Sequence, residues 1–308
     1  MSKIITITFS PSIDKSAAVL SLVAEKKMHC FAQESEPGGG GINVARVLNR
    51  LGGDVLAVFP SGGYTGAHLN QLLHNEKVPF EAIQCKNETR ESFAIRDELT
   101  KKQYRFGMPA NRLFKNEWLD CLKIIKNQQQ VDFIIASGSL PIGVPLDVYA
   151  QLSKIAKKHR AKFIIDTSGD ALKKAVEVGV YLLKPNLEEL GILLGTDSLK
   201  IEDVEAAAKE LICRNNCEII VTSLGAKGAV LVTKEKSFHV KPPKVVVKST
   251  IGAGDSMVAG IVFGLSHGES LEKSLQYGVA CGTATTMNLG SQLCKKKDVK
   301  MLLKVLRS

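Results

Sequence analysis

The chain has 308 residues, of which 44% are hydrophobic, and a formal net charge of +10. This length suits one large domain or two smaller ones, and no run of about 18 apolar residues suggests a membrane span. The basic residues are spread along the chain without interleaved aromatic residues, which disfavours a nucleic-acid surface and is compatible with small anionic ligands.

The cysteines and the N-terminal residues both favour a reducing compartment. The seven cysteines are an odd number, are widely scattered and form no Cys-x-x-Cys pair, which is typical of reduced thiols. The first residues, "MSKIITITFSPSIDKS", lack a basic segment followed by a long apolar stretch, so no export signal is visible. We therefore expect a cytoplasmic protein with neither nucleic-acid nor membrane partners.

Apolar and amphipathic segments alternate along most of the chain. In chain order we expect a strand at 3–9, a helix at 41–52, a strand at 54–60, a helix at 65–76, a strand at 131–138, a helix at 145–159, strands at 161–168 and 180–186, a helix at 201–215, strands at 217–225 and 244–248, and helices at 254–267 and 270–288. Continuous apolar strands that alternate with helices predict a parallel sheet covered on both faces, and right-handed connections favour a doubly wound α/β sandwich.

Two polar-rich stretches, residues 15–34 and 90–107, interrupt this alternation. The second contains "FAIRDE" and "KQYRFG" on either side of an "LTK" turn, the pattern of a β-hairpin. Together the two stretches predict a small antiparallel sheet that stands off the main body and is discontinuous in sequence.

The stretch "STIGAGDSMVAGIVFG", residues 249–264, places an acid directly after a glycine-rich turn. Gly252 and Gly254 permit a tight turn whose N–H groups point into one concavity at a helix start, which is an anion site. Asp255 at this place is either a functional carboxylate or only an acid that caps the helix.

Two further segments point to the same kind of ligand. In "PGGGGINVAR", residues 37–46, four glycines lead into a helix through Asn43, which indicates close approach of the backbone to a ligand, although a flexible loop is the alternative. In "LLKPNLEELGILLG", residues 182–195, Asn186 and Glu189 lie three residues apart at a helix start. They can hold the water shell of Mg²⁺, or form an ordinary capping box. A weaker signal is "VTSLGAKGAVL", residues 221–231, which predicts a turn over a phosphate or nucleotide.

Four of these motifs occur in an order that is characteristic of one family. With "GGGGIN", "KPNLEE", "TSLGAKG" and "TIGAGD" in succession, the chain resembles the ribokinase-like, PfkB-type carbohydrate kinases over essentially its whole length. The resemblance implies one domain, residues 1–308, with a ribokinase-like three-layer α/β/α sandwich, a mostly parallel sheet and a discontinuous β-sheet lid at about 15–34 and 90–107. It also implies ATP and a sugar phosphate as ligands, Mg²⁺ and K⁺ as ions, and a homodimer formed through the lid.

The resemblance further implies roles for individual residues. The catalytic base is Asp255, and the anion hole is Gly252, Ala253 and Gly254. The sugar-phosphate contacts are Asp14, Gly39, Asn43, Arg90 and Ser139, with Lys27 and Arg105 as further cationic lid positions. The nucleotide contacts are Lys184, Asn186, Ser223, Gly225 and Gly228, and the Mg²⁺-associated pair, acting through water, is Asn186 and Glu189. The K⁺ loop is Ser249, Ile251, Thr285, Asn288 and Gly290. Relatives carry an arginine at the position of Gln292, and this departure weakens the inference of K⁺.

These roles answer why an acid follows the glycine-rich turn. Backbone N–H groups stabilise the charge of the transferred phosphoryl group, and Asp255 beside them takes the proton of the attacking sugar hydroxyl. We expect the helix dipole to keep Asp255 ionised at pH 7. A P-loop kinase is disfavoured because no Gly-x-x-x-x-Gly-Lys-[Ser/Thr] string is present, and a dinucleotide-dependent oxidoreductase because no glycine fingerprint follows the first strand.

The sugar phosphate is predicted from one position of the glycine loop. Members of the family that act on fructose 1-phosphate or tagatose 6-phosphate usually resemble "GGKGIN", with a lysine where this chain has Gly40. We therefore expect ATP-dependent phosphorylation of fructose 6-phosphate at O1, giving fructose 1,6-bisphosphate. Fructose 1-phosphate and tagatose 6-phosphate remain the alternative substrates.

Overall fold

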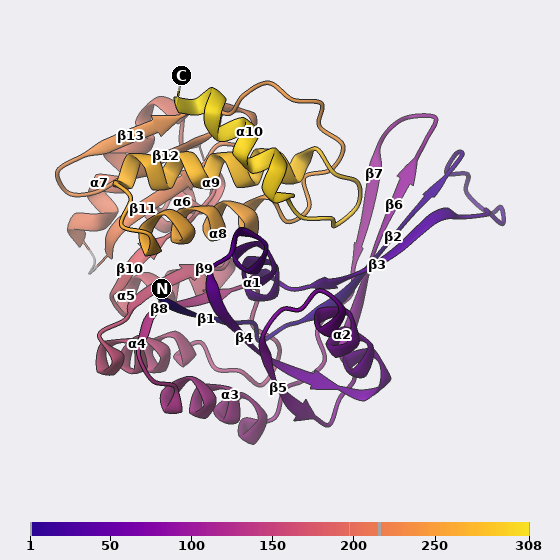
Figure 1. Cartoon of the computed structure of the whole chain (residues 1–308), viewed down its shortest axis with the longest axis horizontal. Helices are drawn as coiled ribbons and strands as arrows, with labels where there is room; N and C mark the ends of the chain where they lie inside the picture. Colours follow the sequence, from indigo (N-terminus) through magenta and orange to yellow (C-terminus); the bar gives the residue numbers. More distant parts are fainter. Residues whose placement is uncertain (1, 197, 215–216, 308) are drawn as a thin grey trace.

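The computed structural model describes residues 2–196, 198–214 and 217–307. A large sheet lies between two layers of helices, and a smaller sheet projects from the body, on the right of Figure 1. This arrangement confirms the predicted three-layer α/β/α sandwich with a mostly parallel sheet and a small β-sheet lid.

The large sheet has the order β13-β12-β11-β10-β9-β8-β1-β4-β5. Neighbours from β11 to β5 run parallel, and β12 pairs antiparallel with both β11 and β13. Central strands such as β8 are buried along nearly their whole length, which explains their continuous apolar sequences. The strands are β1 (Lys3–Ile7), β4 (Asp54–Gly62), β5 (Phe80–Cys85), β8 (Val131–Ser137), β9 (Lys162–Asp166), β10 (Val180–Leu183), β11 (Cys217–Ser223), β12 (Ala229–Val232) and β13 (Ser237–Val240).

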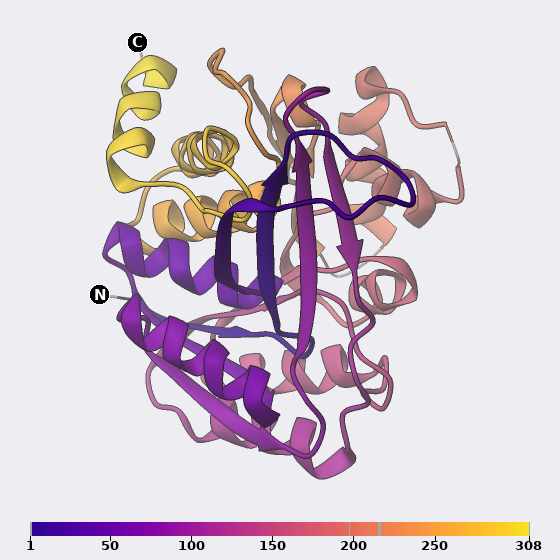
Figure 2. The ribbon, with the colours of Figure 1, turned by 90° about the vertical axis from the view of Figure 1, so that its right-hand side faces the viewer.

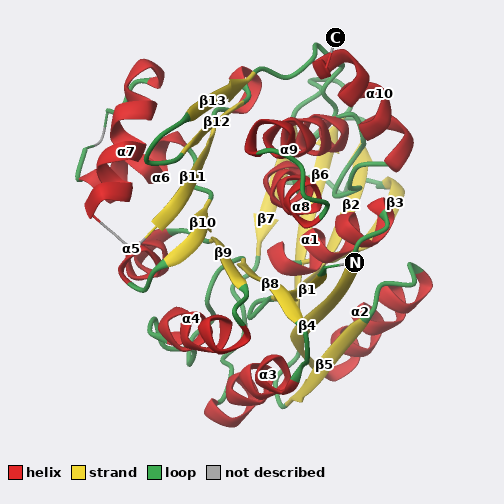
Figure 3. Cartoon of the chain, turned by 60° about the vertical axis from the view of Figure 1, so that its left-hand side comes forward, coloured by secondary structure: helices red, strands yellow, loops and turns green. Residues whose placement is uncertain are grey.

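The helices form two layers, each with its own apolar core against one face of the large sheet (Figure 3). On one face lie α1 (Gly40–Leu51), α2 (Gly63–Asn75), α8 (Ala253–Ser266), α9 (Leu271–Thr286) and α10 (Lys296–Arg307). On the other lie α3 (Lys115–Asn127), α4 (Val148–His159), α5 (Gly169–Glu177), α6 (Leu187–Leu194) and α7 (Val204–Arg214). The short 3₁₀ helices are η1 (Ile201–Asp203) and η2 (Gly225–Lys227).

The smaller sheet, called the lid below, has the order β3-β2-β6-β7 and faces the viewer in Figure 2. Its strands are β2 (Ser12–Val19), β3 (Phe31–Gly38), β6 (Arg90–Asp97) and β7 (Gln103–Gly107). Each hairpin is antiparallel as predicted, but β2 and β6 pair in parallel, so the expectation of a purely antiparallel sheet is wrong. Both β2 and β6 leave the body in the same direction, and this sets their parallel pairing.

The remaining departures from the predicted elements have local causes. Residues 244–248 form neither strand nor helix, because Pro242 and Pro243 precede them and no neighbouring strand pairs with them. The helix expected at 201–215 begins as η1 and continues as α7, and its predicted last residue, Asn215, lies outside the described residues. Sequence analysis did not predict β5, β13, α3 or α5. No helix in the described part of the chain is long and apolar enough to cross a bilayer.

Candidate active site

Asp255 lies in the first turn of α8, but its carboxylate does not cap that helix. The N-cap residue is Gly252, which has a left-handed φ of 72° and no side-chain cap. The carboxylate oxygens accept hydrogen bonds from Asn43 Nδ2 at 2.9 Å and from Ser137 Oγ at 3.4 Å. The capping interpretation of Asp255 is therefore wrong, and the glycine-rich turn alone starts the helix.

The charge state of Asp255 is set mainly by burial. Burial, together with the carboxylate of Asp166, raises the pKa of Asp255 from 3.8 to about 6, against the lowering effects of Asn43, Lys184 and Ser137. Burial therefore has a larger effect on this pKa than the helix dipole has, although the predicted ionised state at pH 7 is retained. A carboxyl group with a pKa of about 6 is still about nine-tenths ionised at pH 7, so the side chain can accept a proton there.

Ser137, Asp166 and Lys184 come from the carboxyl ends of three neighbouring parallel strands. Ser137 ends β8, Asp166 ends β9 and Lys184 follows β10, so the sheet brings them together at one edge. Lys184 is buried and its Nζ lies 3.2 Å from Asp166 Oδ1. Sequence analysis missed Ser137 and Asp166, although a polar residue at the end of an apolar strand was a usable signal.

One cavity, called the sugar-side cavity below, opens between the lid and the body with a volume of about 300 Å³. The residues predicted for the sugar phosphate that line it are Asp14, Gly39, Asn43, Arg90 and Arg105, together with Gly252 and Asp255. The lining does not include Ser139 or Lys27. Ser139 is exposed on the segment after β8, and Lys27 is exposed on the loop that joins β2 to β3.

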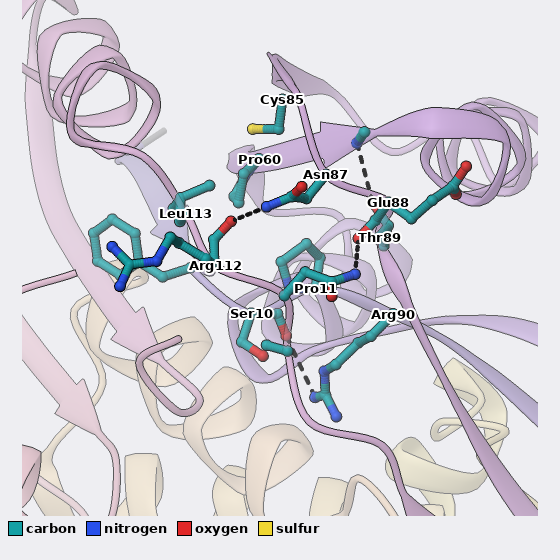
Figure 4. A pocket seen from close by; sticks show the side chains of 14 residues that line it. Ser10, Pro11, Pro60, Cys85, Asn87, Glu88, Thr89, Arg90, Arg112 and Leu113 are labelled. Carbon is teal, nitrogen blue, oxygen red and sulfur yellow. Dashed lines mark hydrogen bonds between the residues drawn. The ribbon is translucent and has the colours of Figure 1, made fainter. Parts of the chain in front are cut away.

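Two charged side chains of the lid, Asp14 and Arg90, are held by specific contacts at this cavity. Asp14 accepts a hydrogen bond from Ser12 Oγ at 2.8 Å, and burial raises its pKa despite that bond and the charge of Arg90. Arg90 donates to Met108 O at 3.0 Å and to Ser10 O at 3.4 Å. Figure 4 shows Arg90 directed towards Ser10, beside a small cavity of about 30 Å³.

Arg105 connects the lid to the glycine-rich turn. Its guanidinium on β7 donates to Thr250 Oγ1 at 2.8 Å, two residues before Gly252. In the structure this arginine therefore lies at the junction between the sugar-side cavity and the glycine-rich turn.

A second cavity, the nucleotide-side cavity, has a volume of about 670 Å³ and lies on the other side of the same turn. It is lined by three predicted nucleotide contacts, Ser223, Gly225 and Gly228, and by Ala253 and Gly254 of the turn. The segment mispredicted as a strand contributes apolar wall to this cavity, and sequence analysis missed that role. Lys244, Val245 and Val247 of this segment line the cavity, together with the preceding Pro242 and Pro243.

The predicted Mg²⁺ pair forms a capping box at the start of α6. Glu189 N donates to Asn186 Oδ1 and Asn186 N donates to Glu189 Oε2, both at 2.8 Å. These bonds leave Glu189 Oε1 outside the box. Burial raises the pKa of Glu189, although the Asn186 N–H and Lys184 lower it. Among the described residues, no group of three or more acidic, histidine or cysteine side chains is placed to hold a metal ion.

The two halves of the predicted K⁺ loop lie against each other. Ser249 Oγ donates to Gly290 O at 2.7 Å and accepts from Ile251 N at 3.2 Å. Thr285 O accepts from the backbone N–H of Asn288 at 3.1 Å, and the Thr285 hydroxyl donates to Ser256 Oγ at 2.7 Å. Both segments adjoin the glycine-rich turn, and their carbonyl and hydroxyl oxygens are the ligand types of a hard monovalent cation.

Comparison with known proteins gives a consistent result along the chain. Residues 7–298 match the family model described as pfkB family carbohydrate kinase. The ATP-dependent 6-phosphofructokinase isozyme 2 of Escherichia coli K12 is 39% identical over 303 residues, which is 98% of both proteins. The 1-phosphofructokinase of Bacillus subtilis is 30% identical over 300 residues, 97% of each protein.

Solved structures agree with this result. The phosphofructokinase-2 from E. coli in complex with substrates and products has a TM-score of 0.95 and 38% identity, covering 99% of this chain and all of that one. Structures of the same E. coli protein in complex with potassium and in a tetrameric inhibited form have TM-scores of 0.95 and 0.93.

Proposed function

Because the chain belongs to the pfkB family of carbohydrate kinases, and is therefore a phosphotransferase, we propose that it transfers the γ-phosphoryl group of ATP to O1 of fructose 6-phosphate, giving fructose 1,6-bisphosphate and ADP. The identity of 39% to the E. coli 6-phosphofructokinase isozyme 2, against 30% to the B. subtilis 1-phosphofructokinase, supports this substrate.

The observation that carries the proposal is the position of Asp255 between the two cavities. Gly252 and Asp255 line the sugar-side cavity, while Ala253 and Gly254 line the nucleotide-side cavity. A sugar hydroxyl and a terminal phosphate that enter from opposite sides therefore meet at this turn. Such in-line positioning is the main requirement for phosphoryl transfer.

In the proposed mechanism each part of the turn has a separate task. Asp255, held by Asn43 and Ser137, accepts the proton of the O1 hydroxyl as the oxygen attacks phosphorus. Backbone N–H groups of residues 252–254 donate to the oxygens of the transferred group, and the nearby Lys184 adds positive charge. A Cβ atom built on Gly254 would lie 3.6 Å from Lys184 Nζ, so the ammonium group is close to the turn.

Mg²⁺ would be held through water by Glu189 and Asn186 and would supply charge neutralisation at the phosphates. The support is the Glu189 carboxylate oxygen that the capping box does not use. The positive charge of Lys184 also lowers the pKa of Glu189, against the effect of burial.

Gly40 supports fructose 6-phosphate over the alternatives. A Cβ atom at this position would overlap Ser137 Oγ and lie 2.9 Å from Gly138 N. The lysine of the "GGKGIN" form therefore does not fit without displacement of Ser137, which contacts Asp255.

The decisive experiment compares kcat/KM for fructose 6-phosphate, fructose 1-phosphate and tagatose 6-phosphate with ATP. We expect a preference of about tenfold or more for fructose 6-phosphate, because a site that hydrogen-bonds ring hydroxyls rejects the wrong isomer. A higher kcat/KM for either rival would refute the substrate, and no turnover of any of the three would refute the proposed reaction.

We further propose that K⁺ binds beside the anion hole and that two chains associate through the lid. The convergence of Ser249 and Gly290, and the potassium complex of the E. coli relative, support the ion. For the dimer, the support is a set of exposed apolar side chains on the lid, Leu20, Phe31, Leu99, Tyr104 and Phe106. Rate against K⁺ concentration at fixed ionic strength tests the ion, and light scattering of the protein and of a Leu99→Glu variant tests the dimer.

The cytoplasm remains the proposed location. The seven cysteines, all within the described residues, are free thiols, and free thiols are typical of a reducing compartment.

A further inference from the structure

Arg46 of α1 is fully buried and forms a cluster that the proposed mechanism does not use. Its Nε donates to both carboxylate oxygens of Glu76 at 3.0 Å, and its Nη1 donates to Pro37 O at 2.8 Å. Its Nη2 pairs with Glu36 and with Glu76. A single guanidinium thus joins the lid strand β3, the entry to the glycine loop and the C-terminal end of α2.

This cluster also reaches the residues that hold Asp255. Arg46 Nη1 lies 3.5 Å from Asn43 Oδ1, and the other end of the same amide, Nδ2, donates to Asp255 Oδ2 at 2.9 Å. A positive donor beside Oδ1 favours the amide orientation in which Nδ2 faces the carboxylate. Glu36 in addition lies opposite Asp14 in the β2–β3 register, so the cluster adjoins the sugar-side carboxylate as well.

The charges of the cluster hold its geometry. Burial alone would lower the pKa of Arg46, but the hydrogen bonds and charges of Glu76 and Glu36 outweigh burial and raise it. For Glu76, burial alone would raise the pKa. The hydrogen bonds and positive charges of Arg46 and Arg50 outweigh burial, so the pKa of Glu76 is lowered. Both partners therefore stay charged, and the fork of the guanidinium has bonds in several fixed directions.

We propose that Arg46 is a positioning residue for the phosphoryl transfer: by holding Pro37 O and the amide of Asn43, it sets the orientation of the Asp255 carboxylate. This inference rests on the proposed function for its kinetic consequences. Arg46 touches no reacting atom and acts only through Asn43 and the glycine loop.

The test is Arg46→Lys, which keeps the charge but cannot make the forked bonds. Because the Asp255 carboxylate would no longer be held in one orientation, kcat should fall by about 10–100-fold. The KM for ATP should change by less than about threefold. Loss of the ordered Asn43 bond should also move the acid limb of the kcat/KM profile upward by about half a pH unit or more, since that bond lowers the pKa of Asp255 in the ligand-free protein. The other charged groups facing Asp255, Asp166 and Lys184, are unchanged in this variant.

Arg50→Lys is the matched control. Arg50 also pairs with Glu76, at 3.1 Å, but the hydrogen bonds of its side chain go to Glu76 and Cys294 O, away from the glycine loop. We expect it to leave the acid limb and kcat unchanged. If the acid limb of Arg46→Lys lies at the same pH as that of the unaltered protein, Arg46 is only structural and the inference is overturned. This holds even if the melting temperature of the variant is lower.

Two further measurements keep the outcome decisive. If Arg46→Lys does not fold, Glu76→Gln, which removes the charge anchoring the guanidinium, should shift the acid limb in the same direction, and an unshifted limb would refute the proposal. The pKa of Asp255 can also be followed by carboxyl ¹³C NMR, assigned with Asp255→Asn. This titration tests Arg46 even if the unaltered protein phosphorylates none of the sugar phosphates, an outcome that would refute the proposed function alone.

Discussion

Replacing Asp255 with asparagine is expected to abolish most activity while making the ligand-free protein more stable. Burial holds the pKa of Asp255 at about 6 in the folded protein, above its ordinary value of 3.8. The folded state therefore binds this proton more tightly than the unfolded state does. Stability is lost as the pH rises from about 3.8 to about 6, and the full penalty of the buried charge is present above that range.

The size of the effect follows from the same two values. The difference between 3.8 and about 6 corresponds to about 3 kcal/mol, because one pKa unit is about 1.36 kcal/mol. Asparagine carries no charge, so Asp255→Asn should raise the free energy of unfolding at pH 7.5 by up to about 3 kcal/mol and change it little at pH 4. The variant should also lose about 10²–10⁴-fold in kcat, because it cannot accept the proton.

Urea denaturation at pH 7.5 and pH 4, with turnover measured on the same samples, checks both expectations. Asp170→Asn is the control, since Asp170 lies in the first turn of α5 and its side chain is 80% exposed. That variant should lose a few tenths of a kcal/mol of stability at pH 7.5, as expected for an acid near a helix N-terminus. A loss of about 1 kcal/mol in Asp255→Asn at pH 7.5, as for a removed cap, or a near-normal kcat would refute the reasoning.

The remaining predictions concern the acid limb and three other positions. The kcat/KM of the unaltered protein, which reports the ligand-free enzyme, should be half-maximal near pH 6 and about a tenth of its plateau at pH 5, whereas a limb near pH 4 would show that burial does not control Asp255. Glu189→Gln should raise the Mg²⁺ concentration needed for half-maximal rate, while an unchanged requirement with a lower melting temperature would leave Glu189 as a cap only. Arg90→Ala should raise the KM for fructose 6-phosphate by about 10–150-fold with less effect on ATP, since charge-assisted hydrogen bonds contribute about 1.5–3 kcal/mol each; comparable use of free fructose by the unaltered protein would contradict this. Gly40→Ala should lower kcat by displacing Ser137, and a normal kcat would show that the glycine loop accommodates the added methyl group without disturbing Asp255.

Much of the fold could be predicted from the sequence because it depends on local patterns. Buried parallel strands have an apolar interior, as "FIIA" of β8 does, and amphipathic segments such as α4 face the sheet with one side. Edge elements were harder, since β5 is only partly buried and β13 is a short strand at the sheet edge, so neither has a strong pattern. Residues 244–248 were wrongly predicted as a strand because a run of β-branched residues has the composition of a strand whether or not a neighbouring strand is present to pair with it.

For the site, the amino-acid sequence indicates which residue types are available and where the chain turns: glycines before α1 and α8, an acid in the first turn of α8, and a capping pair at α6. What those residues do depends on how the elements pack. The tertiary structure brought Asn43 and Ser137, which lie more than a hundred residues before Asp255 in the chain, into contact with that carboxylate. It also buried the carboxylate beside Asp166, which raises its pKa where the helix dipole alone predicted the opposite. The physical reason is that burial and charge proximity are properties of packed elements, and no local segment contains them.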